Sequence, residues 1–247
     1  MSAIVLIPAR YASTRLPGKP LLAETGKPLV QHVVEAVACA RRADRVAVAT
    51  DDDRIAAAVR SFGGSVVPTR SDHASGTDRL AEAAGLLGLP DAAIVVNVQG
   101  DEPELPAACV DRLVELIETG RAPMATLATD LDPAAASDPA RVKVVVDLDG
   151  RALYFSRAPI PHDRDGVGLG RFLLHLGVYA YRAGFLRQYA ALAPTPLEQT
   201  EKLEQLRALE NGHSILVGRV EYHGAGIDTR TDYDAFVRRF RAGGSST

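Results

Sequence analysis

Three cationic side chains lie close together near the start of the chain. Arg10, Arg15 and Lys19 fall within the segment Ile7–Pro20, separated largely by small residues, glycine and proline. Several cations and accessible backbone N–H groups in one loop suit a di- or triphosphate, whose charge is spread over many oxygens. The alternative is a solvated basic loop without a ligand. The segment matches neither Gly-x4-Gly-Lys-Ser/Thr nor Gly-x-Gly-x-x-Gly, the common phosphate-binding patterns.

Two aspartates have positions suited to binding a metal ion beside such phosphates. Asp101 follows the apolar run 91–98, and Asp228 lies in Gly226–Thr229, at another junction between apolar residues and a turn. Carboxylate oxygens are preferred ligands of Mg2+, which usually keeps phosphate oxygens in its shell. The alternative for Asp101 is an acid at a helix start, and we interpret the triplet Asp51–Asp53 in that way, as helix capping. The sequence separation leaves open whether Asp101 and Asp228 meet.

The elements that would position these residues alternate between strands and helices in the first half of the chain. Four apolar runs are typical of buried strands, at residues 3–7, 45–50, 65–68 and 91–98. Three segments have helical spacing, at residues 30–37, 55–62 and 107–117. The alternation predicts an α/β fold with a mainly parallel, Rossmann-like sheet and helices on both faces. Ligands of such sheets bind beyond the carboxyl ends of the strands. Three loops are expected there, at residues 8–19, 69–78 and 99–103.

The second half of the chain has a different pattern. Apolar segments at 142–147 and 152–155 flank a turn and predict a β-hairpin. Four further elements are expected: strands at 173–181 and 215–220, and helices at 198–209 and 231–241. These patterns predict a smaller, partly antiparallel lobe inserted into the parallel unit, with the chain returning to the main sheet near residue 215.

The composition limits the class of protein. The 247 residues carry a net charge of −3, which argues against a nucleic-acid-binding protein because such proteins usually have a basic excess. No apolar run approaches the roughly 18 residues of a membrane span. The start of the chain lacks the order of a signal peptide, so we expect a cytoplasmic protein without a membrane partner. Cys39 and Cys109 lie outside any metal or redox spacing and are expected to be buried thiols.

Taken together, the motifs resemble those of a known family. The segment Ile7–Pro20 resembles the signature of the CMP-Kdo synthetases (3-deoxy-manno-octulosonate cytidylyltransferases), within the sugar nucleotidyltransferase superfamily. Further family motifs occur in the same order at 49–51, 69–79, 96–103, 153–161, 175–179, 196–198, 203–207 and 226–229. The resemblance implies that an acceptor hydroxyl attacks the α-phosphorus of CTP and that pyrophosphate leaves. It also implies a Mg2+ cofactor, an acidic sugar as acceptor, with Kdo expected, and a homodimer.

The resemblance further implies roles for individual positions. The expected catalytic residues are Arg10, Arg15, Lys19, Asp101 and Asp228, and the two aspartates are the expected metal ligands. The expected CTP-binding residues are Pro8, Ala9, Arg10, Ser13, Arg15, Lys19, Arg70, Ser75, Gly76, Gln99 and Gly100. The expected acceptor-binding residues are Gln99, Arg157, His175, Tyr179, Glu204 and Gln205.

The resemblance also implies how the chain is organised. We expect a single nucleotidyltransferase domain, 1–247. Within it, we expect a nucleotide-binding core at about 1–125 and 210–241, an acceptor-binding and dimerisation lobe at about 126–209, and a flexible tail at 242–247.

The chain departs from the family's pattern on the acceptor side. Leu174 stands where the family usually has arginine, and His162 stands where an aromatic Trp or Tyr is common. The stretch Asp165–Gly170 is glycine-rich and shorter than the corresponding family segment. Two alternatives therefore stay open. One is a cytidylyltransferase acting on another small acid, such as a phosphonate; the other is a non-catalytic nucleotide-binding relative, against which the intact Lys19 and its aspartates argue.

Overall fold

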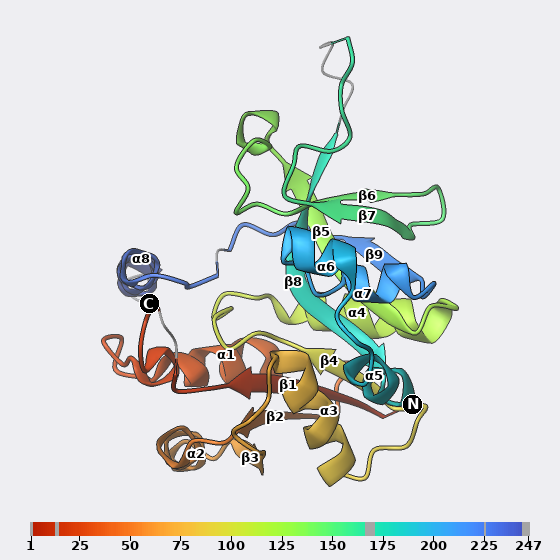
Figure 1. Ribbon diagram of the computed structural model, residues 1–247. Coiled ribbons are helices and arrows are strands. Elements are labelled where there is room, and N and C mark those ends of the chain that lie inside the picture. Colours follow the sequence, from red (N-terminus) through yellow and green to blue (C-terminus); the bar gives the residue numbers. More distant parts are fainter. Residues whose placement is uncertain (1, 13–14, 166–170, 225, 244–247) are drawn as a thin grey trace.

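A computed structural model describes residues 2–12, 15–165, 171–224 and 226–243 (Figure 1). Its described strands are β1 (Ala3–Ala9), β2 (Arg45–Thr50), β3 (Ser65–Pro68), β4 (Ile94–Asn97), β5 (Met124–Leu131), β6 (Lys143–Val146), β7 (Ala152–Ser156), β8 (Phe172–Arg182) and β9 (Ile215–Arg219). They form one sheet with the order β3-β2-β1-β4-β8-β5-β9, from which β6 and β7 branch.

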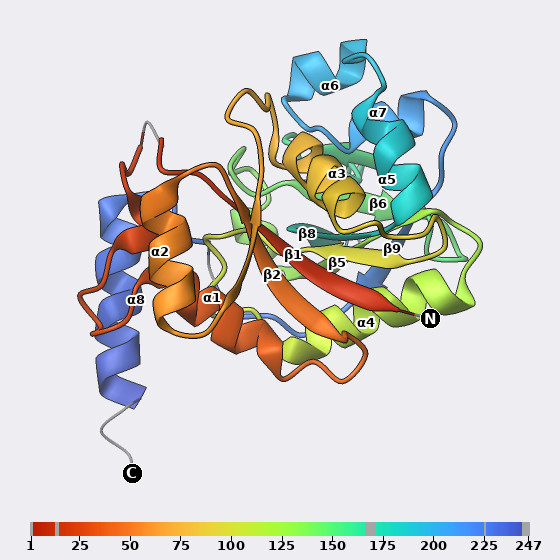
Figure 2. The same ribbon diagram turned by 90° about the horizontal axis from the view of Figure 1, so that it is seen from below.

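The helices cover both faces of this sheet. They are α1 (Leu29–Ala38), α2 (Asp53–Ser61), α3 (Gly76–Leu86), α4 (Ala107–Thr119), α5 (Ala183–Ala190), α6 (Pro196–Glu201), α7 (Leu206–Glu210) and α8 (Arg230–Gly243). Short 3-10 helices span Lys19–Leu21 and Pro133–Ala135. Figure 2 shows α3 and α5 on one face of the central strands and α1 and α4 on the other. The predicted α/β architecture is thus confirmed.

Alternate side chains of the central strands supply two separate cores. In β1, Ile4 and Leu6 pack on the side of α3 and α5, whereas Val5 and Ile7 pack on the side of α1 and α4. All four side chains are buried. Strands that are buried on both faces have continuous apolar sequences, as the runs in the first half of the chain do.

Strand direction divides the sheet into two parts. β1 pairs in parallel with β2 and β4, and β2 pairs in parallel with β3. β8 runs antiparallel between β4 and β5, and β5 pairs in parallel with β9. β5 and β8, which fall in the predicted lobe, therefore belong to the central sheet. The β6–β7 hairpin projects from the sheet (Figure 1) and joins β8 through the pair Lys143–Leu174.

The prediction of one continuous helix at 198–209 is wrong. The chain forms α6 and α7 instead, because Lys202 has left-handed backbone angles, with φ 55°, and ends α6. An ion pair between Arg207 and Glu198, at 2.5 Å, joins the two helices across the break, and Leu203 is buried beneath it. The interruption places Glu204 and Gln205 in the turn between the helices rather than on a regular helical face.

Three smaller expectations have different outcomes. Cys39 is exposed just after α1, so the prediction of a buried thiol is wrong there, whereas Cys109 is buried on α4, and burial raises the pKa of its thiol to about 11. Capping by the acidic triplet is confirmed, since the Asp52 carboxylate accepts hydrogen bonds from the first turn of α2. The final helix extends through Gly243, two residues into the predicted tail, and 244–247 lie outside the described residues.

No helix in the described part of the chain is long and apolar enough to cross a bilayer.

Candidate active site

The loop after β1 closes on itself before it reaches Lys19. The Gly18 N–H donates to the carbonyl of Tyr11 at 3.1 Å, and Gly18 has a φ of +67°, which side-chain-bearing residues rarely adopt. A Cβ on Gly18 would lie 3.2 Å from the Tyr11 ring, whose face is also covered by the Arg54 guanidinium. Glycine therefore permits the turn that delivers Lys19 to the site. Ser13 lies outside the described residues.

Lys19 lies between the two predicted metal ligands. Its Nζ is 2.7 Å from Asp101 Oδ2 and 3.7 Å from Asp228 Oδ1, and its side chain is only 14% exposed. It also donates to the carbonyl of Ile227 at 2.7 Å. The Arg15 guanidinium lies 2.9 Å from Asp228 Oδ1. The two aspartates therefore meet at one point, which the sequence separation had left open.

Backbone contacts hold this meeting point together. The Ile227 N–H donates to the carbonyl of Asp101 at 2.9 Å, so the segment before α8 is fixed to the turn after β4. The Asp228 N–H donates to the Asp232 carboxylate in the first turn of α8. A Cβ on Gly100 would lie 3.1 Å from the carbonyl of Pro8, so a glycine at this position allows the turn to approach the end of β1.

Two adjoining clefts open beside these residues. The first, which we call the carboxylate cleft, is lined by Arg15, Lys19, Pro20, Gly100, Asp101 and Asp228. The second, the serine cleft, is lined by His73, Ala74, Ser75, Gly76 and Arg79. Both are also lined by Pro8, Ala9, Arg10 and Gln99, so they are continuous. They lie beyond the carboxyl ends of β1 and β4, where an α/β sheet is expected to bind its ligand.

The serine cleft is built around the start of α3. The Ser75 hydroxyl accepts a hydrogen bond from the Asp78 N–H, and the Asp78 side chain accepts one from the Ser75 N–H. This capping box fixes Gly76 at the first helical position, where free N–H groups and the helix dipole favour negative charge. Arg79 donates to Thr69 and pairs with Asp51 at 2.7 Å, so it ties the loop after β3 to the end of β2.

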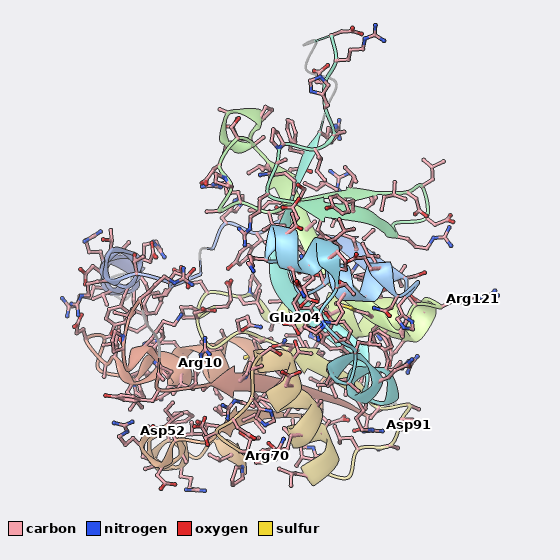
Figure 3. The ribbon with its side chains drawn as sticks, in the orientation of Figure 1. Arg10, Asp52, Arg70, Asp91, Arg121 and Glu204 are labelled. Atoms are coloured by element: carbon pink, nitrogen blue, oxygen red, sulfur yellow. The ribbon has the colours of Figure 1, made fainter. Side chains whose placement is uncertain are left out.

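Arg70 is the one described CTP-binding candidate that does not line either cleft. Its guanidinium lies 3.4 Å from Glu82 and 3.5 Å from Asp72, and its side chain is 68% exposed. Figure 3 shows it beside α3, apart from Arg10 at the end of β1. His73 and Arg79, which the sequence analysis did not single out, line the serine cleft in its place. Both residues lie in the segment 69–79. The motif therefore predicted which segment lines the serine cleft, but it did not single out these two residues.

Four of the predicted acceptor residues lie in two places: Glu204 and Gln205 in the turn between α6 and α7, and His175 and Tyr179 on β8. The Ser75 hydroxyl donates to Glu204 Oε1 at 3.3 Å, which joins the serine cleft to the turn between α6 and α7. Burial raises the pKa of the Glu204 carboxyl, and burial together with the nearby Glu204 charge raises that of the Tyr179 hydroxyl. The Tyr179 and His175 ring centroids are 5.4 Å apart. Gln205 is buried, and its Nε2 donor has no partner among the described residues.

Arg157 is engaged elsewhere. Its guanidinium donates to the carbonyls of Pro139 and Glu201 at 2.8 Å and to that of Lys202 at 3.4 Å. The Lys143 ammonium donates in turn to the carbonyl of Arg157 at 2.6 Å. The side chain thus joins the base of the β6–β7 hairpin to the end of α6, and contact with a substrate would require it to give up carbonyl partners.

Comparisons with known proteins identify the family of the chain. The family model for cytidylyltransferases matches residues 4–215. A 3-deoxy-manno-octulosonate cytidylyltransferase from Syntrophobacter fumaroxidans (strain DSM 10017 / MPOB) is 54% identical over 240 residues, which cover 96% of each chain. The chain belongs to the cytidylyltransferase family.

Solved structures add to this assignment. A structure of CMP:2-keto-3-deoxy-manno-octonic acid synthetase complexed with CTP superposes with a TM-score of 0.93 at 42% identity, covering 98% of this cytidylyltransferase and all of the other chain. The resemblance to the CMP-Kdo synthetases is thereby confirmed. A Leptospira borgpetersenii cytidylyltransferase, with 18% identity and a TM-score of 0.63, covers 96% of this chain and 85% of its own and shows only the shared fold.

The carboxylate cleft of this cytidylyltransferase suits a magnesium ion. No group of three or more His, Cys, Asp or Glu side chains is placed to hold a metal among the residues described. Asp101 and Asp228 offer carboxylate oxygens in one cleft. A hard cation that takes two protein carboxylates and completes its shell with phosphate and water oxygens fits this donor set.

Glu102, the neighbour of Asp101 in the chain, forms a partly buried pair with Tyr222. The Tyr222 hydroxyl donates to Glu102 Oε2 at 2.5 Å. Burial raises the pKa of the Glu102 carboxyl to about 7, and the charges of Asp101 and Asp228 act in the same direction, against the hydrogen bond from Tyr222. Glu102 lies in the motif 96–103, whereas no sequence pattern pointed to Tyr222 as its partner.

The cytidylyltransferase should lose stability in mild acid through His175. Burial lowers the pKa of His175 to about 3, while an unfolded histidine titrates near 6.5. The unfolded chain therefore takes up a proton first, so this contribution is complete above pH 6.5 and declines as the pH falls toward 3. Relative to His175→Gln, the wild-type unfolding free energy should fall by up to about 1.4 kcal/mol per pH unit below pH 6.5.

Urea unfolding at a series of pH values between 7.5 and 4 measures this difference. His223→Gln, which changes an exposed histidine, is the control and should follow the wild type. Parallel curves for wild type and His175→Gln would show that His175 is not held neutral by the fold.

Proposed function

We propose that this cytidylyltransferase transfers CMP from CTP to Kdo with release of pyrophosphate, and that it requires Mg2+. The observation that carries the proposal is the position of Lys19, with its Nζ between Asp101 and Asp228 in a cleft that Arg10 and Arg15 also line. This combination of three cations and two carboxylates suits a triphosphate and its counterion. The relative that is 54% identical over 96% of the chain carries the name of this reaction.

The cations of the cleft would act mainly on the leaving group. Transfer of a nucleotidyl group depends on positioning and on neutralising charge, because the phosphate itself supplies the electrophile. Arg10, Arg15 and Lys19 would hold the β- and γ-phosphates and stabilise the charge that builds on pyrophosphate. Lys19 is held by Asp101 and the carbonyl of Ile227, so its ammonium is already oriented before CTP arrives.

The reaction needs no covalent intermediate on the protein. The acceptor hydroxyl oxygen forms a bond to the α-phosphorus, the bond from that phosphorus to the α,β-bridging oxygen breaks, and the hydroxyl proton passes to solvent. Mg2+ held by Asp101 and Asp228 would supply charge neutralisation at the α-phosphate and lower the pKa of the attacking hydroxyl. The serine cleft, with its free N–H groups at Gly76, would receive the nucleoside side of CTP.

The acceptor would bind against Glu204, Gln205, Tyr179 and His175. Gln205 Nε2 is a buried donor with no partner in the part of the chain that the structure describes, and such a donor carries a free-energy penalty unless a ligand or water pairs with it. Ser75 touches Glu204, so the acceptor group adjoins the nucleotide group. This adjacency brings an acceptor hydroxyl toward the α-phosphate.

We also propose that the protein works as a homodimer through the β6–β7 hairpin. Leu148 and Leu153 are exposed on this projecting hairpin, with Leu148 fully open to solvent. Burying two such side chains against a second copy would remove apolar surface from water. Sedimentation of the wild type and of Leu153→Asp tests this, since a monomeric wild type would exclude the dimer.

A pyrophosphate-release assay tests the activity. The purified chain is supplied with CTP, Mg2+ and Kdo, and each component is omitted in turn. Release that requires all three supports the proposal, and UTP should be a poor substitute for CTP. Release with another small acid, such as a phosphonate, but not with Kdo would assign the acceptor alternative, for which Leu174 and His162 are the motivating positions. Measurable CTP binding without release with any acid in a broad panel would leave a nucleotide-binding module.

A further inference from the structure

The pairing of β5 with β8 is interrupted beside the acceptor residues. Thr126 lies opposite Tyr179, but the next residue of β5 lies opposite Leu176, so residues 177–178 have no partner on β5. His175 and Tyr179 lie on either side of this interruption, and their ring centroids are 5.4 Å apart. A bulge bends the strand that contains it, so it affects how these two side chains are placed.

The Thr126 hydroxyl lies inside this bulge. Its Oγ1 is 2.8 Å from the carbonyl oxygen of Val178, 3.1 Å from that of Leu176 and 3.0 Å from Nε2 of His175. A threonine hydroxyl has one proton, and a carbonyl oxygen can only accept. The proton is therefore directed to the two carbonyls, and the hydroxyl has only lone pairs to offer His175. Nε2 must then be the donor in the third contact.

We propose that Thr126 holds His175 as the Nε2–H tautomer, so that His175 presents an unprotonated Nδ1 to the acceptor. Nδ1 has no hydrogen bond to any described residue, yet it is not among the fully buried polar atoms that lack a partner, so solvent or a ligand can reach it. The tautomer follows from the contacts of Thr126 alone. The identity of the ligand rests on the proposed function.

The surroundings of His175 keep the ring neutral. Phe155 packs edge-on against it at 4.9 Å between centroids, and Tyr179 covers another side. Burial lowers the pKa of His175 to about 3. Near neutral pH the ring therefore carries one proton, and only one of its nitrogens can donate.

A fixed tautomer decides what His175 can recognise. An unprotonated Nδ1 accepts a hydrogen bond from a hydroxyl, but it offers no proton to a carboxylate, whose oxygens are also acceptors. His175 therefore selects a hydroxyl of the acceptor and disfavours its acid group. The acid must be met by N–H donors elsewhere, and Nε2 of the buried Gln205, which has no partner among the described residues, could be one of them. Thr126 acts as a positioning residue, because it works through His175.

Nitrogen-15 NMR of the histidine rings tests the tautomer without any substrate. A long-range proton–nitrogen spectrum of the labelled full chain near pH 7.5 shows which ring nitrogen carries the proton. His175→Gln identifies the signals of His175 by their loss. The proposal expects a protonated Nε2 and an unprotonated Nδ1. A proton on Nδ1, or a doubly protonated ring, would overturn it whatever the enzyme's acceptor proves to be.

Variants of Thr126 test whether the tautomer of His175 affects binding of the acceptor. Thr126→Ser keeps the hydroxyl and should keep the wild-type spectrum. Thr126→Val keeps the shape but removes the hydroxyl, so the His175 signals should move toward an average of both tautomers. For Thr126→Val, KM for Kdo should rise about threefold to tenfold, as for a lost neutral hydrogen bond, while KM for CTP stays within about twofold. If folded Thr126→Val had the same KM for Kdo as the unaltered enzyme, the role of Thr126 in acceptor recognition would be refuted. If the unaltered enzyme itself were inactive with Kdo, the proposed function would be refuted instead.

Discussion

Lys19→Ala should lower kcat/KM by about a thousandfold or more, equivalent to about 4 kcal/mol of transition-state stabilisation. The side chain lies almost buried between two carboxylates, with its Nζ 2.7 Å from Asp101 Oδ2 and also hydrogen-bonded to the carbonyl of Ile227. Alanine would remove the cation that, in the proposed reaction, neutralises the charge on the leaving pyrophosphate. It would also leave the carboxylates of Asp101 and Asp228 close together without the ammonium group that lies between them, so that their charges repel.

Steady-state kinetics of pyrophosphate release with varied CTP measure the loss. Lys27→Ala is the matched control, because Lys27 is a partly exposed lysine paired with Glu35 on the surface. It should remain within about twofold of the wild type, as expected for an exposed ion pair. Lys19→Arg separates charge from placement, since the longer planar group keeps the cation but not the position of Nζ. A loss smaller than about tenfold for Lys19→Ala would refute a direct role in the reaction.

Asp101→Asn should depress turnover by about two to three orders of magnitude and change CTP affinity by less than about tenfold. Asparagine keeps the size of the side chain and can still accept a hydrogen bond from Lys19, so the local fold should survive. It loses the negative charge that, in the proposed reaction, would hold a divalent cation. The Mg2+ concentration that gives half-maximal activity should therefore increase.

Titration of activity with MgCl2 and titration of binding with CTP give the two quantities separately. Asp53→Asn is the matched control, because Asp53 is an exposed aspartate in the first turn of α2. Removal of metal with EDTA should abolish turnover of the wild type, and added Mg2+ should restore it. Unchanged turnover and Mg2+ requirement in Asp101→Asn would exclude this carboxylate as a metal ligand.

The first half of the fold was predictable because its signals are local. Each parallel strand is a continuous apolar run, and each helix that the analysis recognised repeats its apolar residues at helical spacing. α3 was less visible, since its start at Gly76 falls inside a motif read as a loop. The position of β8 between β4 and β5 depends on pairing between distant segments, and no local pattern encodes it.

The candidate site shows the same difference between local and long-range signals. Residue types alone pointed to the loop that carries Arg10, Arg15 and Lys19, but they left open whether it binds phosphate or is a solvated basic loop. The contact between the Asp101 turn and the Asp228 segment depends on a backbone hydrogen bond that residue types do not encode. The break at Lys202 could not be predicted either, because left-handed backbone angles are uncommon for lysine and no glycine marks this helix end. That break determines where Glu204 and Gln205 lie.

The contact between Lys19, Asp101 and Asp228 has a consequence for the synthesis of the protein. A ribosome releases the loop that carries Lys19, together with Asp101, long before it reaches Asp228. During this interval Lys19 has one of its two carboxylates, and the backbone bond from Ile227 to Asp101 is absent. If Asp228 has the role that we propose, a nascent chain, or a fragment cut between these aspartates, should have no transferase activity. Consumption of CTP would then begin only after Asp228 has been translated and its segment has docked.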